Sequence, residues 1–207
     1  MMKSKNIKQF DLSLKSKLKK TEIVAYDECG RGSMAGIFVA ASVIVPDDYF
    51  NDKINDSKQI SEPLRFELAE EIKRNCIWNI VDYSPAQIDM YGVQKINIQS
   101  FLDLRDKVEI SDAIHIIDGT IMDSEPWCIS IPKGDATSFG IACASIVAKA
   151  YRDQIMIDLS KDYPNHRLDK NKGYGLDYIN AINEFGIPKD IHRHSFKLKK
   201  KEANGFF

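Results

Sequence analysis

The sequence has no long hydrophobic run, few cysteines and little net charge. Its apolar stretches fall far short of the roughly 20 residues that a membrane-spanning helix needs. The basic N-terminus is not followed by a hydrophobic segment of the kind found in secretory signals. These absences lead us to expect a cytoplasmic protein without membrane contact.

The cysteines lack the spacing that metal sites require. Cys29, Cys76, Cys128 and Cys143 form no Cys-x-x-Cys pair and have no paired histidine, which argues against zinc. Without an export signal, we expect these thiols to be reduced and mostly buried.

The formal net charge of −1 does not indicate a protein that binds polyanions through charge alone. Lysines nevertheless crowd both ends of the chain, at 15–20 and 197–201, and a solvated tail is the default interpretation of such runs. With 207 residues, the chain can bury a sizeable core as one domain, with or without an appendage.

Strand and helix patterns alternate along the chain. Residues 1–20 are polar, and we expect them to be a poorly ordered basic segment. Two runs rich in Val, Ile and Ala, separated by a glycine-rich turn, predict a pair of strands. The predicted strands are 22–26, 36–45, 76–83, 113–117 and 127–132, and the predicted helices are one beginning after Ser61 and those at 97–109, 136–160 and 176–185.

This order of elements predicts an α/β fold with a mixed β-sheet flanked by helices and a helical C-terminal extension. We assign residues 21–163 to a catalytic domain and residues 164–207 to the helical extension and basic tail. The helix at 136–160 is dense in alanine near its start, and so little side-chain bulk lets a helix pack unusually close to a sheet.

The most informative stretch places Asp27 and Glu28 at the end of an apolar run and follows them with Gly30-Arg31-Gly32. Neighbouring side chains of a strand face opposite sides, so these two carboxylates reach one site only where the strand ends or bulges. The glycines let backbone N–H groups approach a ligand closely. Carboxylates beside an accessible backbone and an arginine suit a metal ion that binds a phosphodiester. A sharp turn with a surface ion pair would explain the same residues.

Two further carboxylates follow apolar strands or turns. Asp118 directly follows the mostly apolar run 113–117 and precedes a glycine, whereas Asp135 follows a Lys-Gly turn, where an N-cap is the ordinary interpretation. Four converging carboxylates repel one another unless cations hold them together, and oxygen ligands suit Mg²⁺ or Mn²⁺. Two such ions can activate water and stabilise the leaving oxygen in phosphodiester hydrolysis.

These residues belong to a longer ordered series of motifs. The series resembles ribonuclease HII, the type 2 ribonuclease H family, from about residue 22 to residue 196. Its members are Asp27-Glu28-x-Gly-Arg-Gly-x-x-Ala-Gly, Asp56-Ser57-Lys58, Asp118-Gly119, Lys133-Gly134-Asp135, the segment 142–149 with Arg152-Asp153, Lys172-Gly173-Tyr174-Gly175 and His192-Arg193-His194-Ser195-Phe196.

The resemblance implies a ribonuclease-H-like fold and a metal-dependent endoribonuclease. Its expected substrates are RNA–DNA hybrids and duplex DNA with embedded ribonucleotides, which it would nick on the 5′ side of the ribonucleotide. The expected products carry 3′-hydroxyl and 5′-phosphate ends. The resemblance also points to a monomer.

The family's functional residues carry over by position. The resemblance makes Asp27, Glu28, Asp118 and Asp135 the catalytic residues and the ligands of two Mg²⁺ or Mn²⁺ ions, with Asp27 shared by both. It assigns contact with the 2′-hydroxyl to Gly30-Arg31-Gly32 and packing on the sugar at the RNA-to-DNA junction to Tyr174, and the 2′-hydroxyl is the group that distinguishes RNA locally. The residues that suit substrate contacts, mainly to phosphates, are Lys58, Lys133, Ser145, Lys149, Lys172 and Arg193.

The chain departs from the family in the loop after the first carboxylates. Cys29 stands where the family commonly has alanine, and residues 32–37 lack two family prolines. We expect the missing prolines to loosen this loop while leaving the ligand positions intact.

Other interpretations stay open at this point. The chain could be a broader nuclease that cuts long hybrids or DNA junctions, or a non-catalytic hybrid-binding protein. His192 and His194 could drive metal-free acid–base cleavage, which would leave the carboxylates unexplained. Two weaker motifs resemble peptides that dock on sliding clamps, namely Gln9-Phe10-Asp11-Leu12-Ser13-Leu14 and the terminal Phe206-Phe207.

Overall fold

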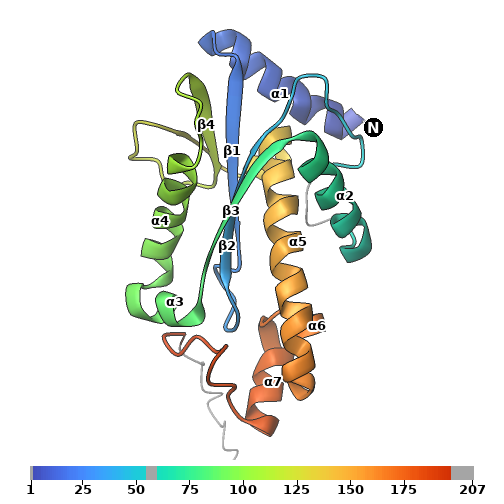
Figure 1. The fold of residues 1–207 in the computed structure, drawn as a ribbon, viewed down its shortest axis with the longest axis vertical. Coiled ribbons are helices and arrows are strands. Elements are labelled where there is room, and N and C mark those ends of the chain that lie inside the picture. Colours follow the sequence, from blue (N-terminus) through green and yellow to red (C-terminus); the bar gives the residue numbers. More distant parts are fainter. Residues whose placement is uncertain (1, 55–59, 197–207) are drawn as a thin grey trace, which may run out of the picture.

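A five-stranded mixed sheet runs through the molecule in the order β3-β2-β1-β4-β5 (Figure 1). The computed structural model describes residues 2–54 and 60–196. β1 pairs antiparallel with β2 and parallel with β4, while β3 and β5 form the edges. The strands are β1 (Glu22–Cys29), β2 (Phe38–Ile44), β3 (Ile77–Tyr83), β4 (Ala113–Asp118) and β5 (Ile129–Ile131).

Helices cover both faces of the sheet. The long helix α5 (Phe139–Asp162) lies along β1 and β2 with α2 (Glu62–Asn75), while α3 (Pro85–Tyr91) and α4 (Val93–Asp106) lie on the opposite face. Within the described ranges, no helix is long and apolar enough to cross a membrane. The remaining elements are α1 (Met2–Leu18), η2 (Gly134–Ala136), η3 (Pro164–His166), α6 (Leu168–Asn171) and α7 (Gly175–Phe185).

Side chains alternate along β1 and divide the core into two layers. Ile23 and Ala25 belong to a cluster on the side of α5 that also contains Ile141. Val24 and Tyr26 pack instead with Phe101 of α4. Because strand neighbours face opposite sides of a sheet, the next two residues of β1 face α5 and α4 in turn.

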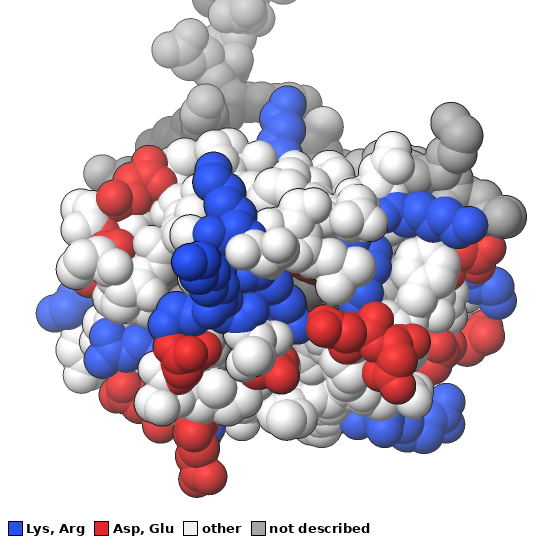
Figure 2. Space-filling view, turned by 90° about the horizontal axis from the view of Figure 1, so that it is seen from above, with Lys and Arg blue, Asp and Glu red and all other residues white. Residues whose placement is uncertain are grey.

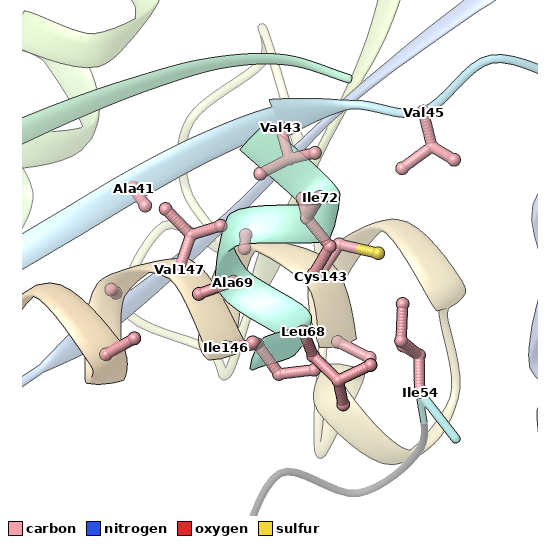
Figure 3. Close-up of a cluster of buried hydrophobic side chains, with 14 of the residues drawn as sticks. Ala41, Val43, Val45, Ile54, Leu68, Ala69, Ile72, Cys143, Ile146 and Val147 are labelled. Carbon is pink, nitrogen blue, oxygen red and sulfur yellow. The ribbon is translucent and has the colours of Figure 1, made fainter. Parts of the chain in front are cut away.

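Helix α2 closes the core on the α5 side, as Figure 3 shows. Leu68 and Ile72 of α2 lie in one cluster with Cys143 and Ile146 of α5, and β2 contributes Val43. All four cysteines are free thiols, but only Cys143 is fully buried and the other three are half-buried. The expectation that the cysteines are mostly buried is therefore met at one position.

Helix α5 lies close to the strands, as its alanine-rich start predicts. A Cβ atom at Gly140 would come within 2.9 Å of the Cβ atom of Ala25. That separation is shorter than real Cβ contacts allow, so only glycine fits where the helix crosses β1. Ala142 and Ala144 are fully buried along the same helix.

Most of the predicted elements form close to where the pattern places them, but α3 is not among the predicted helices. The sequence predicts a single helix at 97–109, whereas the chain forms both α3 and α4 before Lys107. Ser84 caps α3 by accepting the backbone N–H of Gln87, and Pro85 occupies its first turn, two signals that the prediction overlooks. Gly92, with a φ of +81°, allows the turn between the two helices.

The first twenty residues correct the expectation of a poorly ordered segment. Residues 2–18 form α1, and Ile7, Phe10 and Leu14 pack against the core. These three positions are three and four residues apart and so lie on one face of the helix. Because the rest of the segment is mostly polar, this narrow apolar stripe is easily missed in the sequence. Asp11 accepts the backbone N–H of Gly140 at 2.8 Å and so joins α1 to the first turn of α5.

The lysines of α1 do not form a uniformly basic surface. Lys15 makes an ion pair with Asp47 at 2.7 Å, and Lys8 donates to the carbonyl oxygen of Pro46 at 2.9 Å. Figure 2 shows the end of the molecule that carries α1, where Lys and Arg side chains lie beside Asp and Glu side chains. Local ion pairing therefore accounts for part of the N-terminal lysine run.

The C-terminal helices pack against the end of α5 and the turn after β1. Leu168 of α6 and Tyr178 of α7 share a cluster with Met156 of α5 and with Ala35. The predicted boundary between residues 163 and 164 follows the end of α5, and the division into domains stays a prediction.

The contact between Asp11 and α5 predicts a specific pH dependence. Burial raises the pKa of Asp11 from its ordinary 3.8 to about 6, so the folded protein keeps this proton where the unfolded chain has lost it. The free energy of unfolding should therefore fall as pH rises from about 4 to 6, by roughly 3 kcal/mol from this group. Asp11→Asn keeps an acceptor for Gly140 and removes the charge.

Urea unfolding at pH 4 and pH 7 measures this effect. Asp11→Asn should be more stable than the wild-type protein at pH 7 and close to it at pH 4. The matched control is Asp48→Asn, since Asp48 is an exposed aspartate on the loop after β2. If the Asp11→Asn difference is the same at both pH values, the buried carboxylate does not titrate as described.

Candidate active site

Two adjacent carboxylates end β1 on opposite faces of the sheet. Asp27 is only 4% exposed and lies on the α5 side, where Lys149 and Ser145 act on its carboxylate. Glu28 is half-buried on the α4 side, next to Asn97. The alternation predicted from the strand pattern is thus present, and Asp27 accepts the backbone N–H of Glu28 at 2.8 Å.

Asp118 lies close enough to act on the carboxylates on both faces of the sheet. β4 runs parallel to β1 with Tyr26 opposite Ile117, so the next position places Asp118 beside Asp27. The negative charge of Asp118 acts on both Asp27 and Glu28. We call these three residues the carboxylate cluster.

Burial and mutual repulsion set the acidity of this cluster. Burial raises the pKa of Asp27 well above its usual range, the charges of Glu28 and Asp118 raise it further, and Lys149 opposes the rise. Burial and then Asp118 raise the pKa of Glu28 to about 7, against the effect of Arg31. Asp27 and Glu28 therefore hold their protons more tightly because a neighbouring carboxylate is near each of them.

Asp135 lies in the turn that supports Asp118. It is 3% exposed within η2, and Gly134 of the same turn donates its N–H to the Asp118 carboxylate at 2.5 Å. A Cβ atom at Gly134 would lie 3.0 Å from that carboxylate oxygen. The N-cap of α5 is Ser138, which accepts the N–H of Ile141, so the N-cap interpretation of Asp135 is wrong.

The donors at this site suit a hard divalent cation. In the part of the chain that the structure describes, no three His, Cys, Asp or Glu side chains converge tightly enough to hold a metal ion as they stand. The carboxylate cluster nevertheless offers only oxygen donors, and its raised pKa values record repulsion that a cation would relieve. The residues fit Mg²⁺ or Mn²⁺ by donor chemistry, and binding would draw them together.

The loop after β1, residues 30–37, begins within two residues of the cluster, and we call it the glycine loop. Gly30 is buried with a φ of +93°, whereas Arg31 and Gly32 are exposed. The loop is tied to the C-terminal part of the chain, because Met34 donates its N–H to the carbonyl oxygen of Gly173 at 2.9 Å. This bond restrains the glycine loop, and the expectation that the missing prolines loosen it stays a prediction.

Tyr174 lies against the glycine loop, at the end of the segment 172–174 that we call the tyrosine loop. Its ring is 37% exposed and packs over the guanidinium of Arg152, with 5.2 Å between the guanidinium carbon and the ring centroid. The structure therefore places the predicted sugar-contacting residues in adjacent loops.

The predicted phosphate contacts are dispersed. Lys149 donates to Ser145 at 2.6 Å on α5, and both adjoin Asp27. Lys133 is exposed in the turn before η2. Lys172 is half-buried and makes an ion pair with Glu62 at 2.7 Å. Lys58 lies outside the described residues.

Arg193 differs from the expectation of a phosphate contact. Its side chain is fully buried and donates to the carbonyl oxygens of Gly30 at 2.6 Å and Gly36 at 2.9 Å. The basic tail sequence gives no sign of this burial. His192 is also buried. Its ring nitrogen Nδ1 is hydrogen-bonded to the hydroxyl of Tyr178 at 3.0 Å, so this histidine is part of the packed C-terminal core.

Sequence reasoning missed the roles of two buried polar residues. Arg152 is fully buried on α5, and Asn97 is fully buried on α4 beside Glu28. Each lies among buried helix residues that are mostly apolar, and a polar residue at such a position was the available signal.

A family profile described as ribonuclease HII matches residues 24–199. The chain belongs to the ribonuclease HII family. Proteins named ribonuclease HII from Mycoplasma capricolum and Caldanaerobacter subterraneus are 38% and 39% identical to it. The first match covers 95% of this chain and 96% of the relative, and the second covers 86% and 74%. As in that family, the chain is an endoribonuclease of the RNase H type that acts on RNA–DNA hybrids.

Solved structures show the same fold. Archaeoglobus fulgidus RNase HII, solved in a complex with PCNA, has a TM-score of 0.70 at 24% identity, covering 90% of this chain and 100% of that one. Ribonuclease H2 from Pyrococcus horikoshii has a TM-score of 0.69 at 19% identity, covering 86% and 94%. Bst-RNase HIII in complex with Mn²⁺ has a TM-score of 0.65 at 16% identity, covering 86% and 67%. The predicted ribonuclease-H-like mixed sheet is confirmed.

Two glycines of the RNase HII loop provide a matched pair of substitutions. A Cβ atom at Gly30 would lie 2.5 Å from Nε of Arg152 and 2.8 Å from the carbonyl oxygen of Ile37, at a φ that side chains rarely adopt. Gly30→Ala should therefore lower the free energy of unfolding by roughly 2–4 kcal/mol. At Gly32 nothing lies within 4 Å, so Gly32→Ala should change it by less than about 0.5 kcal/mol.

Chemical denaturation of the two variants beside the wild-type protein measures the difference. Equal losses of stability in both variants would show that the glycine loop is not packed as described.

Proposed function

We propose that the chain nicks duplex DNA on the 5′ side of embedded ribonucleotides by two-metal-ion hydrolysis, leaving 3′-hydroxyl and 5′-phosphate ends. The observation that carries this proposal is the carboxylate cluster, in which β1 and β4 bring Asp27, Glu28 and Asp118 together and the negative charge of Asp118 raises the pKa values of both Asp27 and Glu28. The glycine loop begins two residues after Glu28, so chemistry and sugar contact share one end of the sheet.

The acids have defined roles under this proposal. Asp27, Glu28, Asp118 and Asp135 would hold Mg²⁺ or Mn²⁺, and the Mn²⁺ complex of Bst-RNase HIII supports a divalent ion. Two such ions, when bound, supply an activated water and stabilise the leaving oxygen. Lys149 and Arg31 favour the ionised forms of Asp27 and Glu28, which are the forms that ligate a cation.

The glycine and tyrosine loops supply selectivity. Arg31 and Gly32 expose backbone and side-chain donors that suit a 2′-hydroxyl, the group that marks a ribonucleotide within DNA. The ring of Tyr174 is exposed enough to pack against the next sugar and test whether that hydroxyl is missing. Lys133 and Lys149 suit the flanking phosphates.

The partner assignments have unequal support. The PCNA complex of the Archaeoglobus fulgidus relative supports a clamp contact for this chain. Residues 9–14 lie within α1, with Phe10 and Leu14 packed on the core, so they would dock only if α1 left the sheet. Phe206 and Phe207 lie outside the described residues. We also propose a monomer in the cytoplasm.

A cleavage assay on three matched duplexes tests the proposal. The substrates are duplex DNA with one ribonucleotide, the same sequence as DNA alone, and a long RNA–DNA hybrid. With Mg²⁺ or Mn²⁺ we expect a cut on the 5′ side of the lone ribonucleotide, loss of cutting with EDTA, and no cutting of the DNA duplex. Asp118→Asn should reduce the rate by about 100-fold or more, because it removes one charge from the metal site.

The control is Asp112→Asn. Asp112 precedes β4 at the end opposite Asp118 and makes an ion pair with Lys20, so its loss should leave the rate unchanged. Cutting that persists in EDTA, or equal cutting of the all-DNA duplex, is incompatible with the proposal.

A further inference from the structure

Arg152 is a buried arginine whose contacts are almost entirely to backbone. Helix α5 runs past the turn between β1 and β2 toward α6 and α7 (Figure 1). Arg152 belongs to this helix and has no exposed surface. Among the described residues, Arg152 takes part in no ion pair. The adjacent Asp153 is paired instead with Arg65 of α2.

Burying a guanidinium without a carboxylate partner costs free energy, because the charge is removed from water without a compensating opposite charge. An apolar side chain of similar length, such as the Met156 that follows one turn later, would pack there without that cost. The retained arginine therefore indicates a task that requires its several donors.

The donors of Arg152 reach both loops. Nε donates to the carbonyl oxygen of Ile37 at 2.9 Å. Nη2 donates to Oγ of Ser33 at 2.8 Å, to the carbonyl oxygen of Ala35 at 3.0 Å and to that of Lys172 at 3.1 Å. One guanidinium thus holds three points of the glycine loop and one of the tyrosine loop.

The glycine loop and the tyrosine loop are in direct contact. Oγ of Ser33 lies 3.1 Å from the carbonyl oxygen of Lys172 and 3.2 Å from that of Gly173. A Cβ atom at Gly173 would lie 2.8 Å from the carbonyl oxygen of Ala35, so the two backbones are in direct contact. Arg152 lies where they cross.

The same guanidinium contacts both ends of the proposed sugar-reading surface. The ring of Tyr174 packs over it, an arrangement in which the cation attracts the ring face. A Cβ atom at Gly30 would come within 2.5 Å of its Nε, so the backbone at Gly30 rests directly on it. Arg193 adds hydrogen bonds to the carbonyl oxygens of Gly30 and Gly36, which both lie in the glycine loop.

We propose that Arg152 is a positioning residue that fixes the glycine loop and the tyrosine loop as one unit, and so sets selectivity for the RNA-to-DNA junction. The selectivity part rests on the proposed function, whereas the coupling of the loops does not. Arg152 touches no reacting atom in this arrangement. Its loss should therefore disturb recognition of the junction more than the hydrolytic step.

The test replaces the guanidinium while keeping its charge. Arg152→Lys retains a cation but cannot bond to four acceptors in two loops. We expect its preference for the single-ribonucleotide duplex over the long hybrid to fall by about tenfold, with cleavage of the long hybrid within about threefold of wild type. Ser33→Ala removes the hydroxyl that both loops share and leaves the charge of Arg152 in place. It should lower the preference for the single-ribonucleotide duplex by less than Arg152→Lys does.

Hydrogen exchange supplies a readout independent of catalysis. Backbone amides of residues 33–37 and 172–174 should lose protection together in Arg152→Lys, while those of β1 and β4 keep it. The matched control is Arg65→Lys, which alters the neighbouring pair with Asp153 and should leave both loops protected.

Each outcome bears on a separate claim. Unchanged loop protection in both Arg152→Lys and Ser33→Ala overturns the coupling, and so does protection lost in one loop only. Coupled loops in a protein whose wild type shows no junction preference would overturn the proposed function and leave the coupling standing. Equal losses on both substrates, with the loops uncoupled, would overturn the selectivity role of Arg152.

Discussion

Repulsion among buried carboxylates is the constraint on which the rest of this structure depends. Asp27, Glu28 and Asp118 are gathered at one end of the sheet, where Glu28 and Asp118 raise the pKa of Asp27 and Asp118 raises that of Glu28. No isolated turn could keep them together, because the repulsion would separate the strands that carry them. The parallel pairing of β1 with β4 and the bond from Gly134 to Asp118 hold them in place. The site is therefore under electrostatic strain that a bound cation would relieve.

The surrounding structure provides rigidity by unusual means. The core on the α5 side is closed by α2 and by a glycine crossing at β1, so the strand carrying Asp27 has little freedom. In the glycine loop, backbone carbonyl oxygens accept hydrogen bonds from two buried arginines, Arg152 and Arg193, rather than from water. The proposed recognition of a single 2′-hydroxyl group needs such rigidity, because a displaced donor loses its hydrogen-bond geometry.

The sequence could predict the sites that follow from local pattern. Asp118 could be predicted because an apolar strand leads straight into it, and the fold could be predicted from the order of strands and helices. The burial of Arg193 could not be predicted. A basic tail has the same sequence whether it is solvated or hydrogen-bonded to a loop 157 residues away. The same holds for Asp11, whose partner at Gly140 lies 129 residues further along the chain. Long-range bonds of this kind leave no local periodicity to detect.

The most direct test of the account uses Asp27→Asn, which keeps an acceptor for the N–H of Glu28 and removes the most buried charge of the cluster. Thermal unfolding would be followed at pH 8, with and without Mg²⁺, beside the wild-type protein. The account predicts that the metal-free variant unfolds at a higher temperature than the metal-free wild type, because repulsion is relieved. It also predicts that Mg²⁺ raises the unfolding temperature of the wild type and not that of the variant. A metal-free variant less stable than the wild type, or equal stabilisation of both proteins by Mg²⁺, would contradict it.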